Sequence, residues 1–143
     1  MNIKIKYHAP ITPLKNIEGA KSDWIDLRAA ENVILNKGEW KYVSLGVSME
    51  LPEGYEAHIV PRSSMLKRFG IIQANSVGII DNSFKGDNDI WMIPVIAVRD
   101  TMINFDERIC QFRLFKNQEP LSFEKVDTLN NADRGGYGST GVK

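Results

Sequence analysis

Hydrophobic and polar residues alternate along four short segments of the chain, which span residues 3–8, 43–51, 55–59 and 110–114. Successive side chains of a strand point to opposite faces of a sheet, so each segment is predicted to be a half-buried strand. Glycine-containing turns precede the second and third of these segments. Short strands separated by turns indicate a fold built mainly from β-structure.

Two further segments complete this picture. Residues 90–98 are almost continuously apolar, which favours a strand buried on both faces, and Pro94 predicts a sheet edge or a bulge there because proline has no N–H to donate. Only residues 63–69 are typical of a helix, with a serine to cap its start and Gly70 to end it. We therefore expect an all-β subunit, a jelly roll or β-sandwich with one short helix.

The 143 residues fit one domain, but the pattern changes near the C-terminus. From about Asn130 the sequence NNADRGGYGSTGVK is rich in glycine and small polar residues and has no hydrophobic periodicity. We predict a jelly-roll domain over residues 1–128 and an extended, flexible C-terminal arm over residues 129–143.

Charge and cysteine content narrow the possible functions. Lys plus Arg and Asp plus Glu both number 18, so no global field favours nucleic acid or an acidic membrane, and a bound polyanion must be held locally. Cys110 is the only cysteine, which excludes an internal disulfide and favours a small buried hydrophobe in a reducing compartment. With no signal-like or membrane-length apolar run, we expect a cytoplasmic protein.

Two segments have the composition of a phosphate site. In Pro61-Arg62-Ser63-Ser64, N–H groups, hydroxyls and a guanidinium converge where a strand precedes the predicted helix. A helix cap with a surface arginine explains the same residues. Glycines in the tail segment 134–141 permit exposed N–H groups that wrap a polyphosphate, although such a terminus is more often only a mobile end.

Two aspartates are candidates for chemistry. Asp81 follows the apolar pair Ile79-Ile80, so its carboxylate either holds and deprotonates a water at the end of a strand or forms a turn with its own backbone. Asp26 stands between apolar neighbours, either as a salt-bridge partner or as an outer-shell ligand of Mg²⁺. These residues alone do not separate the alternatives.

The order of these segments resembles the trimeric dUTP diphosphatase (dUTPase) family, whose five motifs appear as DWIDLRA, PRSS, GIIDNSFKGD, ERICQF and RGGYGSTG. The resemblance covers nearly the whole chain. It implies a homotrimer of jelly-roll subunits with active sites between them, closed by the C-terminal arm. The implied activity is hydrolysis of dUTP to dUMP and pyrophosphate with Mg²⁺, which limits uracil in DNA and supplies dUMP for dTMP synthesis.

The resemblance also implies roles for individual residues. Asp81 resembles the base that activates water against the α-phosphorus, and Asp26 the acid that holds the metal through water. Phosphate and uracil contacts would come from residues distributed over the other motifs: Arg62, Ser63, Ser64, Gln111, Arg134, Gly138, Ser139 and Thr140 for the phosphates, and Asn75, Gly78, Ile79, Ile80 and Tyr137 for the base.

This chain departs from the family pattern at three places. Phe84 replaces the usual tyrosine and is expected still to pack under deoxyribose and exclude a 2′-hydroxyl. Arg134 stands two residues closer to Tyr137 than the corresponding pair usually does. The segment after the third motif is expanded, so Trp91 is either a lid over the base or, by preference, a core residue.

Two other functions fit parts of the pattern. A dCTP deaminase shares the fold and an RSS segment, but it uses a glutamate on the strand after the third motif, and residues 90–98 contain none. A non-catalytic trimer that binds a nucleotide or a regulatory partner has no need for Asp81 together with a complete tail motif.

Overall fold

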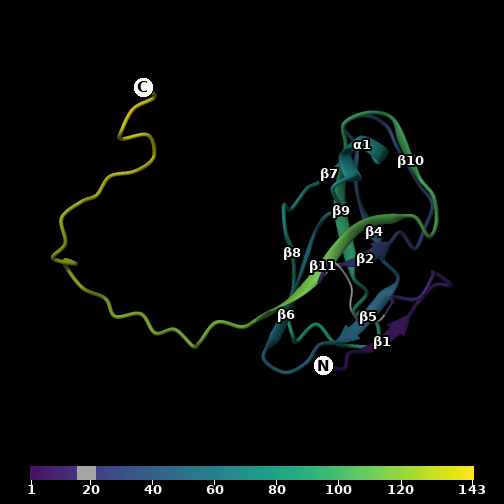
Figure 1. The fold of residues 1–143 in the computed structure, drawn as a ribbon, viewed down its shortest axis with the longest axis horizontal. Coiled ribbons are helices and arrows are strands. Elements are labelled where there is room, and N and C mark those ends of the chain that lie inside the picture. The colour runs from purple at the N-terminus through teal and green to yellow at the C-terminus, as the bar shows by residue number, and fades with distance from the viewer. Residues whose placement is uncertain (16–21) are drawn as a thin grey trace.

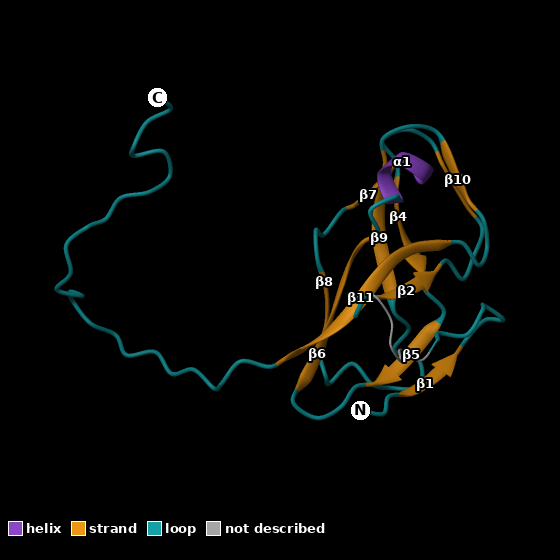
Figure 2. Cartoon of the chain, viewed as in Figure 1, coloured by secondary structure: helices purple, strands orange, loops and turns teal. Residues whose placement is uncertain are grey.

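The structure is a computed structural model that describes residues 1–15 and 22–143. Within these ranges it contains eleven strands and one helix, which confirms the all-β expectation (Figures 1 and 2). The strands are β1 (Lys4–Tyr7), β2 (Ile25–Arg28), β3 (Val33–Leu35), β4 (Trp40–Ser44), β5 (Val47–Glu50), β6 (Tyr55–Pro61), β7 (Ile71–Gln73), β8 (Gly78–Ile80), β9 (Met92–Ala97), β10 (Thr101–Ile103) and β11 (Arg108–Lys116). Helix α1 (Met65–Phe69) lies between β6 and β7.

The strands form two larger sheets and two small ones. One sheet has the order β2-β11-β6-β8 and another has the order β4-β9-β7, while β1 pairs with β5 and β10 pairs with β3. All recorded pairs are antiparallel, so alternate residues of each strand face the interior. The inward side chains meet in one apolar core.

Trp91 lies in this core and has 0% of its surface exposed. Its ring meets that of Phe112 edge-on, with centroids 5.2 Å apart. The interpretation of Trp91 as a core residue is thus confirmed, and its interpretation as a lid is wrong. Cys110 is also buried, as expected, and burial raises the pKa of its thiol.

The predicted strand 43–51 is two strands that belong to different sheets. Its apolar residues are all buried as predicted, but β4 pairs with β9 whereas β5 pairs with β1. The chain changes direction at Gly46, which has φ +68° and whose missing Cβ would lie 2.6 Å from the Ala30 Cβ. Alternation persists through such a bend because both halves still face one core, so the pattern did not reveal the break.

Pro94 lies in the middle strand of its sheet, so the predicted edge or bulge is wrong. It stands opposite Tyr42 of β4, and its carbonyl accepts from the Ala74 N–H on the other side. The N and C=O of one strand residue point the same way, so the proline nitrogen also points toward Ala74, one residue beyond the end of β7. Pro94 therefore removes only one backbone hydrogen bond, the one that its N–H would have donated toward Ala74 just beyond the end of β7.

The short helix follows the prediction at its end but not at its start. Gly70 adopts a left-handed conformation and its N–H donates to the Leu66 carbonyl, as expected of a C-terminal glycine. Ser64 occupies the N-cap position, but its hydroxyl makes no capping hydrogen bond. In the described part of the chain α1 is the only helix, and it is too short and insufficiently apolar to cross a membrane.

The chain leaves the sheets after β11. Every residue from 117 to 143 is exposed, and Figure 1 shows this segment extending away from the strands to the C-terminus. The exposed segment begins before residue 129, where we place the start of the arm. That boundary stays a prediction.

We expect Trp91→Ala to lower the free energy of unfolding by about 3–5 kcal/mol, because a large buried ring is lost and a cavity remains. Trp91→Phe is the matched control and should cost less, since it keeps an aromatic ring beside Phe112 and removes an indole N–H that has no partner. Denaturant unfolding of the two variants measures the difference. A loss below about 1 kcal/mol for Trp91→Ala would contradict the core assignment.

Candidate active site

The register of β11 brings together residues from the first, second and fourth motifs. Gln111 of β11 stands opposite Asp26 of β2 and Val60 of β6, and Arg62 follows the end of β6. The Asp26 carboxylate receives Arg62 Nε at 3.0 Å and Arg108 Nη1 at 3.2 Å. The Gln111 amide donates to the Pro61 carbonyl at 3.0 Å. We call Asp26, Arg62, Arg108 and Gln111 the Asp26 cluster.

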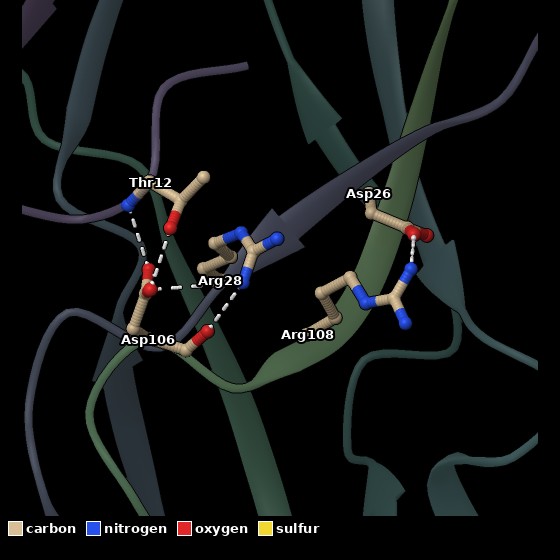
Figure 3. A network of polar contacts seen from close by, with 5 residues as sticks. All are labelled: Thr12, Asp26, Arg28, Asp106 and Arg108. Atoms are coloured by element: carbon tan, nitrogen blue, oxygen red, sulfur yellow. Dashed lines mark hydrogen bonds and ion pairs between the residues drawn. The ribbon is translucent and has the colours of Figure 1, made fainter. Parts of the chain in front are cut away.

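Arg108, which the sequence did not single out, is part of this cluster because β11 begins there. Figure 3 shows its guanidinium directed at Asp26, with a second polar network beside it. In that network Asp106 accepts from the N–H and hydroxyl of Thr12 at 2.7 and 2.6 Å, and its carbonyl accepts from Arg28. The hydroxyl bond from Thr12, then its backbone bond, and to a lesser extent the charge of Arg28, lower the pKa of Asp106. The network holds the turn that leads into Arg108.

The two serines of the second motif lie next to Arg62. Ser63 is exposed, while Ser64 is half-buried at the start of α1. Their hydroxyl groups add neutral donors beside two guanidiniums, a combination that suits a polyanionic ligand. The cluster therefore has the chemistry expected of a phosphate site, and its charge is local, as the zero formal net charge of the chain requires.

Asp81 follows directly on β8, as expected, and the turn that was the alternative interpretation is present. It is exposed at the end of the strand, and it also forms a turn, because its Oδ1 accepts from the Ser83 N–H at 2.8 Å and from the Ser83 hydroxyl at 2.7 Å. These two bonds lower the pKa of Asp81, the backbone bond most. Both bonds use Oδ1, and among the described residues none donates a hydrogen bond to Oδ2.

Asn82 and Ser83 fix the position of that carboxylate. The Asn82 amide donates to the carbonyls of Leu51, Pro52 and Tyr55 at 3.2, 2.9 and 3.3 Å, which ties the turn to the start of β6. Neither residue was assigned a function from the sequence. The spacing Asp-x-Ser is itself a signal for a side-chain-capped turn and would have identified Ser83.

The predicted uracil-binding residues lie on the loop before β8 and on β8 itself. Asn75 is exposed, Ile79 points outward with 57% exposure, and Ile80 is buried. Gly78 packs closely against β6, because a Cβ added at Gly78 would lie only 3.2 Å from the Ile59 Cβ. Phe84 is 39% exposed just beyond Asp81. The chain therefore places an aromatic side chain and a short strand on either side of Asp81 in the sequence.

One chain does not bring Asp81 to the Asp26 cluster. Asp26 is separated from β8 by three inter-strand steps, which amount to about 14 Å. Across the sheet, Asp26 is in register with Val60 of β6 through Gln111. Ile80 is in register with Ala57, so Asp81 is level with Glu56. Val60 and Glu56 are about 13 Å apart along β6. The backbone positions of Asp26 and Asp81 are thus about 19 Å apart on one face of the sheet.

The tail residues are not close to either group. Arg134, Tyr137, Gly138, Ser139 and Thr140 are all exposed, and Figure 2 shows their segment far from both sheets. Turns at Gly136 and Gly138 are closed only by local backbone bonds. In a single chain, these residues form no site with the sheets.

The carboxylate content of the cluster limits how a metal would bind. Among the described residues, no group of three or more His, Cys, Asp or Glu side chains is placed to hold an ion. Asp26 is already paired with two guanidiniums. This donor set fits a Mg²⁺ ion held mainly by phosphate oxygens and water, with Asp26 as an outer partner.

Comparisons with known proteins agree on one family. A model of the dUTPase family matches residues 13–141. The SPbeta prophage-derived deoxyuridine 5'-triphosphate nucleotidohydrolase YosS of Bacillus subtilis (strain 168) is 58% identical over 144 residues, covering 100% of both chains. Family membership rests on these two findings.

Solved structures support the fold. A mutant dUTPase of Staphylococcus bacteriophage 80alpha with dUpNHpp has a TM-score of 0.80 at 17% identity and covers 99% of both chains. A mutant dUTPase from phage phi11 of S. aureus, which coordinates a structural Mg(II) ion, has a TM-score of 0.75 at 15% identity over 92% of this chain and 100% of that one.

We expect Ser83→Ala to raise the pKa of Asp81, because the variant removes the hydroxyl bond that stabilises the ionised carboxylate. Ser83→Thr keeps a hydroxyl at the same place and is the matched control. Carboxyl NMR titration measures both values. An equal pKa in Ser83→Ala and the unmodified protein would show that the hydroxyl does not contribute.

Proposed function

Because the chain belongs to the dUTPase family and is a dUTP diphosphatase, we propose that Asp81 activates the water that attacks the α-phosphorus of dUTP. The observation that supports this role is the geometry of its carboxylate. Ser83 fixes Oδ1 and lowers the pKa, so Asp81 is ionised near neutral pH, and Oδ2 of this exposed residue takes part in neither bond. An ionised, held carboxylate both orients a water and accepts its proton.

The reaction is a displacement at the α-phosphorus. The water oxygen forms a bond to phosphorus as its proton passes to Asp81, and the bond between the α-phosphorus and the oxygen bridging to the β-phosphate breaks. The products are dUMP and pyrophosphate. A carboxylate with a lowered pKa is a weak base, so proton transfer accompanies bond formation and orientation of the water is a large part of its contribution.

The Asp26 cluster would hold the phosphates. Arg62, Ser63 and the Ser64 backbone offer donors on one side, and Gln111 offers an amide on the other. Bound Mg²⁺ would neutralise phosphate charge, with Asp26 reaching it through water. The Arg62 and Arg108 pairs orient that carboxylate before the ligand binds.

The loop and strand around Asp81 would select the base and sugar. Asn75 and the main chain from Gly78 to Ile80 would read uracil, because backbone donors and acceptors have fixed positions. Phe84 would pack under deoxyribose. Arg134, Tyr137, Gly138, Ser139 and Thr140 would close over the bound nucleotide from the arm.

We further propose a homotrimer whose active sites lie between chains. The separation of about 19 Å between Asp81 and the Asp26 cluster supports this arrangement, since groups that act on one triphosphate must lie within its length. Asp81 of one chain would act on a nucleotide held by the Asp26 cluster of another. Assembly would then be a condition for catalysis.

A dCTP deaminase is the nearest alternative with this fold. Its glutamate would lie on the strand after the third motif, and β9 consists of Met-Ile-Pro-Val-Ile-Ala. Incubation with dCTP should therefore release no ammonia. Release of pyrophosphate from dUTP, in contrast, should be rapid with Mg²⁺.

Asp81→Asn should lower kcat for dUTP by about 10²–10⁴-fold with little change in the affinity for dUTP, because the amide keeps the shape but does not accept the proton. Pyrophosphate release measures the rate, and calorimetry with a non-hydrolysable analogue measures the affinity. An unchanged kcat would overturn the role of Asp81.

Mixed trimers test whether sites are shared. Asp81→Asn and Arg62→Ala chains should each be inactive alone, but random co-assembly should restore about a quarter of wild-type activity, since one site in four then combines an intact Arg62 with an intact Asp81 from another chain. Homotrimers mixed without chain exchange are the control. No recovery after verified exchange would place both residues in one chain's site.

A further inference from the structure

Gln73, the last residue of β7, is buried although its side chain is polar. It is 4% exposed, and with Ser48 it is one of two buried polar residues in the described part of the chain. Its Nε2 donates to the Ile59 carbonyl at 2.9 Å. Only the NH₂ end of an amide donates to a carbonyl, so this bond fixes which end is the oxygen.

This hydrogen bond joins the two large sheets where the chain crosses between them. Gln73 belongs to the β4-β9-β7 sheet, and Ile59 belongs to β6 of the other sheet, directly opposite Gly78. Between Gln73 and Gly78, the loop is closed by bonds of its own backbone and by Ala74 N–H to Pro94 O. The Gln73 side chain therefore ties the start of the 74–78 loop to β6 of the opposite sheet.

The oxygen of the same amide is unsatisfied. Gln73 Oε1 is buried and has no hydrogen-bond partner, which is costly inside a protein. A potential donor is close: Gln73 Nε2 and Asn75 Nδ2 lie 3.7 and 3.6 Å from the point where a Cβ on Gly78 would stand. Asn75 is exposed and its side chain can turn inward.

We propose that Gln73 is a positioning residue for pyrimidine recognition, whose Oε1 accepts from Asn75 Nδ2 when the 74–78 loop tightens on a bound base. The inference rests on the proposed function, because it gives that loop a uracil ligand. Gln73 does not touch the nucleotide. It sets the loop at a fixed distance from β6 and orients Asn75, so that the main chain presents one pattern of donors and acceptors.

The test uses Gln73→Met in the full-length trimer, because methionine has nearly the same length but no N–H donor and only a weak acceptor. We expect KM for dUTP to rise about tenfold while kcat stays within about twofold, and the ratio of kcat/KM for dUTP over dCTP to fall about tenfold. Ser48→Ala removes the other buried polar side chain, in β5, and is the matched control with unchanged kinetics.

Asn75→Asp gives an independent measurement, since it keeps the shape of an exposed side chain and replaces only its donor. We expect a similar rise in KM for dUTP. The double variant Gln73→Met with Asn75→Asp should have a KM no higher than that of the weaker-binding single variant, because the two residues act as one unit. If Gln73→Met does not fold, Gln73→Leu, which is also apolar and of similar volume, replaces it in the same assays.

Wild-type KM and selectivity in Gln73→Met would overturn the inference, as would effects that multiply in the double variant. A fall in kcat that follows the loss of thermal stability would also overturn it, because that result indicates a purely structural role. If wild-type protein releases no pyrophosphate from dUTP, both the proposed function and this inference fail. If wild type is active and the variants match it, only the inference on Gln73 fails.

Discussion

The pairing of β11 with both β2 and β6 is the constraint on which the candidate site depends. This strand places Gln111 between Asp26 and Val60 and starts with Arg108, so one register fixes three members of the Asp26 cluster. A shift by one residue would turn Gln111 inward and Phe112 out of its contact with Trp91. Core packing therefore holds the polar site in place, because the same alternation serves both faces.

Electrostatics in this site are local. Asp26 is held between two guanidiniums, and Asp81 is held by a serine, while the formal charge of the whole chain is zero. The two carboxylates differ in what binds them: positive charge orients Asp26, whereas neutral donors lower the pKa of Asp81 and leave one oxygen open. Such different surroundings suit a charge-orienting role for the first and a water-holding role for the second.

Alternation predicted which residues are buried better than it predicted where strands begin and end. Residues 43–51 keep their alternation across Gly46 although the strands on either side join different sheets. The position of Pro94 in its sheet was wrongly predicted because the local sequence does not determine the lateral order of strands. Asp81 and Asp26 were found from motif order. Motif order did not identify Arg108 or the unsatisfied Gln73 Oε1, since both features depend on which strands are neighbours in the fold.

The same sheet that orders these groups also keeps them apart. A packed antiparallel sheet does not bend enough to close a gap of about 19 Å between the backbones of Asp81 and Asp26, which is why we propose that another chain completes the site. The tail is exposed over residues 117–143 and extends away from both sheets (Figure 1). In the proposed assembly, rigid site halves from different chains and a closing arm would meet two separate requirements: the sheets would hold the reacting groups accurately, and the arm would admit substrate and exclude water.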